Sequence, residues 1–315
     1  MAMSVHGLTG SYHSLLKNCF GAIGAVTALS FAVECAKLTW VYFLRPYPSL
    51  KFYGKEWVVI TGGSAGIGFE IAKQLVRAGV YNIVLIARGR SDLEGAKREL
   101  TLLNSNANIR IVTCDAADPD YPSLMKDFQA IESISMLFNN VGVHNDIPTN
   151  IEDMTKDEVN RIIAVNCNFQ VQFTSMLVPK LKLATKSIII NISSLTSKMV
   201  MPMLAVYAAT KAFEDHWSVN LAAELETHHI GVICLRPGIT VSRMSGISTP
   251  SFFCPSASTM ARACLQMIGT GKQSIAPYWP HALLDTVNAL VPSCFSWPIV
   301  REMHNEKRIK LLKEK

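Results

Sequence analysis

Residues 57–79 read WVVITGGSAGIGFEIAKQLVRAG, and this stretch decides the fold. A short apolar strand is followed by a glycine-rich turn and then by apolar positions at helical spacing. Gly62 permits the tight turn, while Gly66 and Gly68 let a pyrophosphate and the strand approach the backbone closely. The helix that begins near Ile67 would aim its N-terminus at that anion. The stretch therefore predicts a dinucleotide-binding strand, turn and helix.

Beyond this unit, apolar strands alternate with amphipathic helices, which is typical of a parallel sheet covered on both faces. Capping-box patterns at Ser91-x-x-Glu94 and Thr155-x-x-Glu158 predict two helix starts. We expect an α/β fold with a Rossmann-type, doubly wound, seven-stranded parallel sheet behind an N-terminal hydrophobic helix. Residues 1–54 would form the N-terminal segment and linker, and residues 55–315 one domain. The predicted strands are 57–61, 82–86, 108–113, 135–138, 187–192, 232–235 and 273–277.

The composition is apolar for a chain of 315 residues: charged residues make up 17%, against roughly 25% in average soluble domains. This bias hints at a membrane. The net charge of +6 is spread along the chain, with adjacent basic pairs only at Lys97-Arg98 and Lys307-Arg308. Nucleic-acid binding would require a basic stripe, so we expect none. The eight cysteines are scattered without a C-x-x-C pattern, which predicts free thiols and no metal site.

The second predicted strand is followed by Ala87-Arg88-Gly89-Arg90. About 20 residues past the glycines, an acidic side chain would hold the ribose hydroxyls of NAD and repel a 2′-phosphate. A guanidinium at this place can instead bind a phosphate through two hydrogen bonds. Arg88 therefore favours NADP(H) as the cofactor, and the alternative for Arg88 is a solvated loop charge.

Ser194, Tyr207 and Lys211 form a candidate proton-transfer site. Tyr207 and Lys211 are one helical turn apart and share a face. A neighbouring ammonium lowers the pKa of a phenol, so Tyr207 could give a proton to a carbonyl oxygen or take one from an alcohol. Ser194 follows an apolar strand, at the end where open α/β sheets bind ligands, and would hold the same oxygen.

These motifs, in this order, resemble the short-chain dehydrogenase/reductase family. The matching positions run from the glycine turn through Asp115, Asn139-Asn140-Val141-Gly142, Asn166, Ser194, Tyr207 and Lys211 to Pro237-Gly238. The resemblance implies that Ser194, Tyr207 and Lys211 are catalytic, and that Asn166 completes a tetrad that relays protons through water. It also implies a set of cofactor-binding residues, which are Gly62, Ser64, Gly66, Ile67, Gly68, Arg88, Asp115, Asn140, Tyr207, Lys211, Pro237, Gly238 and Thr240.

Residues 19–44 form an apolar run long enough to span a membrane, with Trp40 and Tyr42 suited to its interface. Glu34 and Lys37 interrupt the run, but they lie three residues apart and could pair on one helix face. A membrane anchor, a helix on the membrane surface and a helix packed on the domain or on a partner all stay open. We favour the anchor.

A second apolar segment, residues 278–300, contains Asp285, Pro292 and Pro298 and is too broken for a plain transmembrane helix. A substrate lid, a membrane-dipping hairpin and simple packing are the alternatives. Both apolar segments, the Asn-Asn-Val-Gly variant and a basic C-terminus resemble the branch of 17β-hydroxysteroid dehydrogenases and very-long-chain 3-oxoacyl-CoA reductases. The branch implies an endoplasmic reticulum membrane protein whose catalytic domain faces the cytoplasm.

The resulting hypothesis is hydride transfer between NADP(H) and a lipid carbonyl or secondary alcohol, in steroid metabolism or fatty acid elongation. The expected partners are an apolar substrate, either a steroid or a fatty acyl-CoA, and the membrane. By the family resemblance, the helices that carry Asn166 and Tyr207 could also pair two subunits as a homodimer. The alternatives are a retinol-like or other lipid alcohol substrate, and an NADP-binding scaffold without turnover.

Overall fold

The computed structural model of the protein describes residues 5–313, which form two compact units, one up to Tyr47 and one from Pro48 onward. The first unit is helix α1 (Val5–Thr39) followed by a π-helical turn, Trp40–Leu44. Within the described residues, Leu16–Leu44 is the one helical stretch long and apolar enough to cross a membrane, although a signal sequence also meets that criterion. Lys37 Nζ donates to Glu34 Oε1 at 2.6 Å, so the two charges inside this stretch pair.

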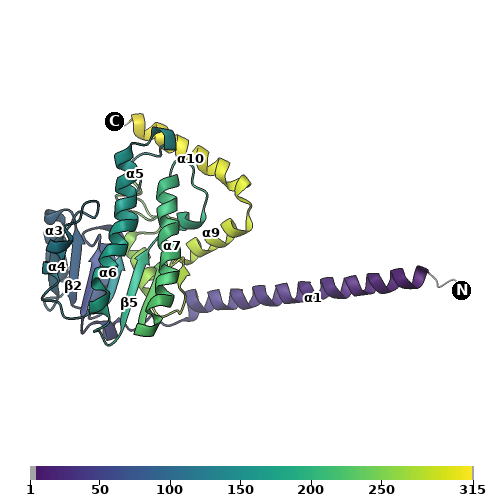
Figure 1. Ribbon diagram of the computed structural model, residues 1–315, viewed down its shortest axis with the longest axis horizontal. Helices are drawn as coiled ribbons and strands as arrows, with labels where there is room; N and C mark the ends of the chain where they lie inside the picture. The colour runs from purple at the N-terminus through teal and green to yellow at the C-terminus, as the bar shows by residue number, and fades with distance from the viewer. Residues whose placement is uncertain (1–4, 314–315) are drawn as a thin grey trace. The chain divides into compact units, whose positions relative to one another are not determined.

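The second unit is built on seven parallel strands in the order β3-β2-β1-β4-β5-β6-β7 (Figure 1). Their bounds are β1 Trp57–Thr61, β2 Asn82–Ala87, β3 Asn108–Thr113, β4 Ile134–Asn139, β5 Ser187–Ile192, β6 Ile230–Leu235 and β7 Ser274–Ile275. The predicted seven-stranded, doubly wound sheet is confirmed, and β1, β3 and β5 have the predicted bounds. The strand order reverses between β1 and β4. The loops that follow these two strands diverge, and the crevice between them is where such folds bind ligands.

Helices cover both faces of the sheet, because right-handed crossovers that run outward in opposite directions, from β1 to β3 and from β4 to β7, place their helices on opposite faces. Helices α4, α6 and α7 lie on one face, and α2, α3 and α8 lie on the other. Figure 1 shows α5 and α6 end to end along one line, with α7 beside them. The bounds are α2 Gly66–Arg77, α3 Arg90–Leu103, α4 Tyr121–Asp127, α5 Lys156–Ile163, α6 Gln170–Leu181, α7 Ala205–Leu225 and α8 Ala257–Gln266.

The core lies between the sheet and these helices. All six residues of β5 are buried, as expected for a strand covered on both faces. Phe169 and Phe173 stack at 5.2 Å between ring centroids, and Phe128 meets Phe173 edge-on at 5.8 Å. Each such ring contributes about 1.5–3 kcal/mol by its burial. This packing holds α6, and the turn that precedes it, against the carboxyl ends of the strands.

The two predicted helix starts have different outcomes. Thr155 and Glu158 form the predicted capping box at the start of α5, each side chain bonding the other's backbone N–H. The box at Ser91 is wrong, because α3 begins at Arg90 with Gly89 as its N-cap and no side-chain cap. The helix therefore already includes Ser91, which cannot act as its N-cap.

Residues just before β1 pack with the second unit. Leu50 and Tyr53, in a 3₁₀ turn, are buried. The Ser135 hydroxyl of β4 donates to the Tyr53 carbonyl at 2.7 Å. Most of the predicted linker, 48–54, therefore lies against the domain that was expected to begin at residue 55.

The chain ends in two helices, α9 (Trp279–Leu290) and α10 (Ser293–Lys313). They are hydrogen-bonded to loops at the strand ends: Asn288 Nδ2 donates to the Lys198 carbonyl at 3.0 Å, and His304 Nδ1 lies 2.6 Å from the Pro202 carbonyl. Arg308 of α10 also pairs with Asp153 at 3.2 Å. Within the apolar segment 278–300, Pro280 and His281 are buried, whereas apolar side chains such as Leu290, Phe295 and Ile299 are exposed, so the lid, the membrane-dipping hairpin and simple packing all stay open.

Candidate active site

The carboxyl ends of β1, β4, β5 and β6 meet at one edge of the sheet and bring most of the predicted site residues together. The glycine turn follows β1, Asn140 follows β4, Ser194 follows β5, and Pro237-Gly238 follow β6. Thr61, the last residue of β1, holds two of these segments: its hydroxyl accepts from the backbone N–H groups of Asn140 and Val141 at 3.0 and 3.1 Å.

The glycine turn has no room for a side chain at Gly62 or at Gly68. Gly62 has a φ of +65°, in the left-handed region that favours glycine. A Cβ on Gly68 would lie 2.5 Å from the Gly62 carbonyl oxygen and 2.5 Å from Asn140 Nδ2. The Asn140 amide in turn donates to the carbonyls of Thr61 and Gly62 at 3.0 and 3.3 Å. Asn140, which was predicted to bind the cofactor, thus holds the glycine turn in place through two hydrogen bonds.

Helix α2 begins at Gly66 without a side-chain cap, because its N-cap residue is Ala65. The first N–H groups of a helix have no partner inside it, so an anion can bind there. Gly66 has a φ of +57°, and nothing lies within 4 Å of the position its Cβ would take. Ser64 and Ile67 flank this turn and are partly exposed. The backbone geometry fits the pyrophosphate of a dinucleotide.

Tyr207 and Lys211 lie in the first two turns of α7, beside Ser194 at the end of β5. Lys211 Nζ lies 5.9 Å from the centroid of the Tyr207 ring, and the Ser194 side chain is hydrogen-bonded to Tyr207. Ser193 Oγ donates to the Lys211 carbonyl at 2.7 Å, which ties the end of β5 to α7. The structure thus brings the three predicted catalytic side chains into one place.

The acidity of Tyr207 differs from the sequence prediction. Burial raises the pKa of the phenol above its ordinary value of 10.0; Lys211 lowers it, Glu214 raises it, and the hydrogen bond with Ser194 lowers it. The net direction is upward, so the predicted fall in the pKa is wrong for the protein without cofactor. The physical reason is that burial disfavours the phenolate and that the charge of Lys211 is balanced by a carboxylate.

That carboxylate is Glu214, one turn after Lys211 and fully buried. Lys211 Nζ donates to Glu214 Oε1 at 2.8 Å, to Oε2 at 2.9 Å, and to the Ile192 carbonyl at 3.0 Å. Burial lowers the pKa of Lys211, but Glu214 and Tyr207 raise it by more, and the net direction is upward. The lysine is therefore held as an ammonium whose three protons all face acceptors.

Asn166 lies in a π-helical turn, Ala164–Phe169, between α5 and α6. Such turns are frequent at functional sites. The Asn166 amide donates to the Val143 carbonyl and to Thr210 Oγ1, both at 2.9 Å, and its oxygen accepts from the Val143 N–H at 2.9 Å. Asn166 therefore joins the loop after β4 to α7 close to Lys211, where Gly142 also lies against the ammonium.

Two predicted cofactor residues lie just after the neighbouring strands β2 and β3. Arg88 is exposed and directly follows β2. Asp115 follows β3, and its carboxylate accepts from the Ala117 N–H at 2.9 Å, which shapes that loop. Both lie at the same edge of the sheet as the glycine turn, because β2 and β3 are parallel to β1.

The loop after β6 is held by a histidine from the C-terminal region. The Gly238 N–H donates to His281 Nδ1 at 2.9 Å, and His281 Nε2 lies 3.0 Å from the Phe253 carbonyl. Nδ1 must accept and Nε2 must carry the proton, so the buried ring is neutral. Burial accordingly lowers the pKa of His281. Thr240 Oγ1 donates back to the Gly238 carbonyl at 3.2 Å, which stabilises the predicted Pro237-Gly238 turn.

Sequence reasoning missed three residues of this site. His144 packs edge-on against Tyr207, with 5.6 Å between ring centroids, and its Nε2 lies 3.0 Å from the Met244 carbonyl. Its position just after the Asn-Asn-Val-Gly motif was the available signal. Glu214, three residues after Lys211, could have been found from helical spacing. His281 had no local signal, because Gly238 lies 43 residues earlier in the chain.

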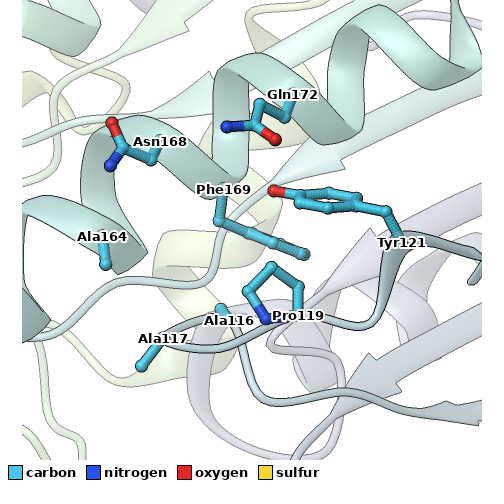
Figure 2. A pocket seen from close by; sticks show the side chains of 8 residues that line it. All are labelled: Ala116, Ala117, Pro119, Tyr121, Ala164, Asn168, Phe169 and Gln172. Carbon is cyan, nitrogen blue, oxygen red and sulfur yellow. The ribbon is translucent and has the colours of Figure 1, made fainter.

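A cavity of about 150 Å³ lies beside the loop after β3 (Figure 2). The Tyr121 hydroxyl and the amides of Asn168 and Gln172 are its polar side-chain groups. None of the predicted catalytic side chains lines it, so it is separate from the proton-transfer site. Its lining residues are Ala116, Ala117, Pro119, Tyr121, Ala164, Asn168, Phe169 and Gln172.

A doubly wound sheet with an anion-binding glycine turn, and a tyrosine beside a lysine at the strand ends, define a dinucleotide-dependent oxidoreductase. The sequence model of the family described as short chain dehydrogenase matches residues 56–250, and the chain belongs to this family. The predicted family is confirmed.

Relatives support the predicted branch as well. A very-long-chain 3-oxoacyl-CoA reductase of Podospora anserina is 31% identical over 95% of this chain and 91% of its own length. The reductase of the same name from Coccidioides immitis is 32% identical over 84% of this chain and 78% of its own. A relative from Caenorhabditis elegans, named as a steroid dehydrogenase, is 30% identical over 93% of this chain and 95% of its own.

Solved structures share the fold. A short-chain dehydrogenase from Sphingobium yanoikuyae, in complex with NADPH, superposes with a TM-score of 0.65 and 23% identity, over 75% of this chain and 93% of its own. A structure of 7beta-hydroxysteroid dehydrogenase gives a TM-score of 0.66 and 16% identity, over 76% and 93% of the two chains. The catalytic unit therefore has the architecture of this enzyme family.

Proposed function

We propose that the protein is an NADPH-dependent reductase of 3-oxoacyl-CoA thioesters, which it converts to 3-hydroxyacyl-CoA in fatty acid elongation. One observation carries this proposal: the similarity to a very-long-chain 3-oxoacyl-CoA reductase extends over 95% of the chain, beyond the residues common to the family. The four candidate catalytic residues, Asn166, Ser194, Tyr207 and Lys211, are all present and lie at one edge of the sheet.

The residues present fit a bound NADP(H). The space that Cβ atoms on Gly62 and Gly68 would fill is closed by backbone and by Asn140, so the turn keeps the shape that receives a pyrophosphate. The uncapped start of α2 favours the anion. Arg88, which is exposed, would take the 2′-phosphate, and Asp115 and Asn140 would bound the adenosine. When bound, NADPH supplies the hydride.

The side chains of the site would supply the proton. Tyr207 donates to the carbonyl oxygen of the substrate as that oxygen gains charge, while Ser194 orients the oxygen by a hydrogen bond. Lys211 holds positive charge beside the phenol, and to bind the nicotinamide ribose it would exchange one of its three present acceptors for a ribose hydroxyl. Asn166 keeps the water that returns a proton to the site. The raised pKa of Tyr207 suits this direction, because a protonated phenol is the form that donates.

A steroid ketone is the second candidate substrate. The Caenorhabditis elegans relative named as a steroid dehydrogenase covers 93% of this chain. The same proton donor would serve either carbonyl, because the chemistry at the oxygen is identical.

We place the protein in the endoplasmic reticulum membrane with its catalytic domain facing the cytoplasm. Residues 1–54 would be the anchor and linker, since Leu16–Leu44 is long enough and apolar enough to cross a bilayer. Residues 55–315 would be the NADP-binding domain, which could form a homodimer through α6 and α7. Recovery of the full-length protein in the soluble fraction without detergent would contradict the anchor.

The substrate can be tested with full-length protein purified in detergent. NADPH oxidation is followed with 3-oxoacyl-CoA of short and very long chains, with steroid ketones and with retinal. We expect the highest kcat/KM with very-long 3-oxoacyl-CoA and negligible turnover in Tyr207→Phe. Faster reduction of a steroid ketone would replace the first candidate by the second, and cofactor binding without reduction of any of these carbonyls would make the protein a silent scaffold.

A further inference from the structure

A buried ladder of polar side chains joins α6 and the turn before it to α7. Asn166, Gln170 and Thr174 are spaced by four residues, as are Thr210, Glu214 and Ser218, and all six are buried. Asn166 bonds Thr210 at 2.9 Å and Gln170 bonds Glu214 at 2.9 Å, while Thr174 and Ser218 are linked through asparagines of β4 and β5. Glu214 is the one charged member of the ladder, and it contacts Lys211.

The surroundings of Glu214 are built to receive a carboxylate. The carboxyl accepts three hydrogen bonds, two from Lys211 Nζ and one from Gln170 Nε2. Gln170 also donates to the Val141 carbonyl at 3.2 Å, so its amide nitrogen is held toward the carboxyl. Buried charges are costly unless they are paired and hydrogen-bonded, and this one is both. Glu214 therefore forms a neutral pair with Lys211.

We propose that Glu214 is a positioning residue that holds the Lys211 ammonium and balances its charge, so that Tyr207 keeps its proton to higher pH. This inference rests on the proposed function, in which Tyr207 is the proton donor. A lone ammonium would stabilise the phenolate and release the proton earlier. With the Glu214 carboxylate beside the Lys211 ammonium, the net charge of the groups next to Tyr207 is zero instead of +1.

The other charged and titratable groups around Glu214 leave this balance in place. Burial raises the pKa of Cys167 to about 11 and that of Cys234 further, so both thiols are neutral near pH 7. The Asp215 carboxylate is matched by Lys198 at 3.8 Å and by Arg236 at 4.0 Å. The groups that face Glu214 from its own helix and its neighbours are Tyr207, Lys211 and Asp215 of α7, Cys167 before α6, and Cys234 of β6.

The protonation of Glu214 falls in a compatible range. Burial raises the pKa of its carboxyl, Lys211 and Gln170 lower it, and the result is about 7. Above that pH the carboxylate is charged, so it is charged throughout the range near the ordinary tyrosine pKa of about 10. Below it, Tyr207 is protonated in any case. Glu214 is therefore ionised in the pH range in which Tyr207 loses its proton.

The size of the effect follows from the distances. Lys211 Nζ lies 5.9 Å from the Tyr207 centroid and 2.8 Å from Glu214, so the carboxylate is within about 9 Å of the phenol ring. At an effective dielectric constant of about 20, removing one charge at that distance changes the midpoint of Tyr207 ionisation by roughly one pH unit. Glu214→Gln should therefore lower that midpoint by about one pH unit.

Tyrosinate absorbance across a pH titration measures this midpoint. Each protein is compared with the same protein carrying Tyr207→Phe, and the difference isolates Tyr207. Glu224→Gln is the matched control, because Glu224 lies exposed on the same helix and loses the same charge. Glu214→Asp keeps the charge and should restore most of the shift. The proposal would be overturned if Tyr207 ionised with the same midpoint in Glu214→Gln as in the wild type. It would also be overturned if Glu214→Asp lowered the midpoint as much as Glu214→Gln does.

The wild-type protein provides a test that needs no Glu214 variant to fold. Its Tyr207 should titrate above the ordinary tyrosine pKa of about 10, and a midpoint well below that value also overturns the proposal. A carboxylate with a purely structural role would lower the melting temperature of Glu214→Gln without moving the midpoint. Because the titration uses no substrate, its result stands even if the protein reduces no 3-oxoacyl-CoA, which would refute only the proposed function.

Discussion

The glycine turn makes a quantitative prediction through Gly68→Ala. The new Cβ would lie 2.5 Å from the Gly62 carbonyl oxygen and 2.5 Å from Asn140 Nδ2, closer than real Cβ contacts allow. One of the two must move, and both belong to the turn that would bind the pyrophosphate. Overpacking of this kind costs about 1–3 kcal/mol, and the better helix propensity of alanine returns about 1 kcal/mol.

The net effect on stability is therefore small, but the effect on cofactor binding should be large. Each loss of about 1.4 kcal/mol in binding weakens affinity tenfold. Since the displaced atoms shape the anion site itself, we expect the Kd for NADPH to rise at least about tenfold in Gly68→Ala. Fluorescence titration of NADPH measures the Kd, and thermal unfolding measures the accompanying change in stability.

Gly95→Ala is the matched control. Gly95 lies inside α3, and nothing is within 4 Å of the position of its Cβ. The substitution should stabilise the protein by up to about 1 kcal/mol and leave the Kd unchanged. If Gly68→Ala bound NADPH within twofold of the wild type, the turn would not be the phosphate site and the reasoning would be refuted.

Three other substitutions test the remaining parts of the site. Tyr207→Phe should retain NADPH binding and lose several orders of magnitude in kcat, and turnover near the wild-type rate would remove the proton-donor role. Arg88→Asp should raise the kcat/KM ratio of NADH to NADPH, because a carboxylate repels the 2′-phosphate; an unchanged ratio would leave Arg88 a solvated charge. The lowered pKa of His281 means that the folded protein binds a proton there less readily than the unfolded chain does. Stability from His281 should thus be complete above about pH 6.5 and fall as the pH drops, so melting curves of wild type and His281→Gln should converge toward pH 5.

The fold was predictable because its signals are local. The run from Trp57 to Gly79 carries its own strand, turn and helix pattern, and the strands of a parallel sheet read as short apolar runs. What escaped prediction depended on contacts between distant segments. The π-helical turn at Ala164–Phe169 interrupts a sequence that reads as one helix, and α3 begins at Arg90, before the predicted cap at Ser91.

The candidate site divides in the same way. The spacing of Tyr207 and Lys211, and the position of Ser194 after an apolar strand, sufficed to place three side chains together. The sequence predicted only that Asn140 lies near the cofactor. It did not show that the Asn140 amide holds the glycine turn in place. His281 reaches Gly238 through the packing of α9, which no local pattern reports.

By itself, the sequence determined the family, the doubly wound sheet and the identity of the residues at its edge, because periodicity and motif spacing act over one or two elements. Only the tertiary structure decided how those residues behave. The pKa of Tyr207 rises although Lys211 is nearby, since burial and the charge of Glu214 outweigh the ammonium. Electrostatic balance in a protein interior depends on which groups are desolvated together, and that is settled when separate helices and strands pack.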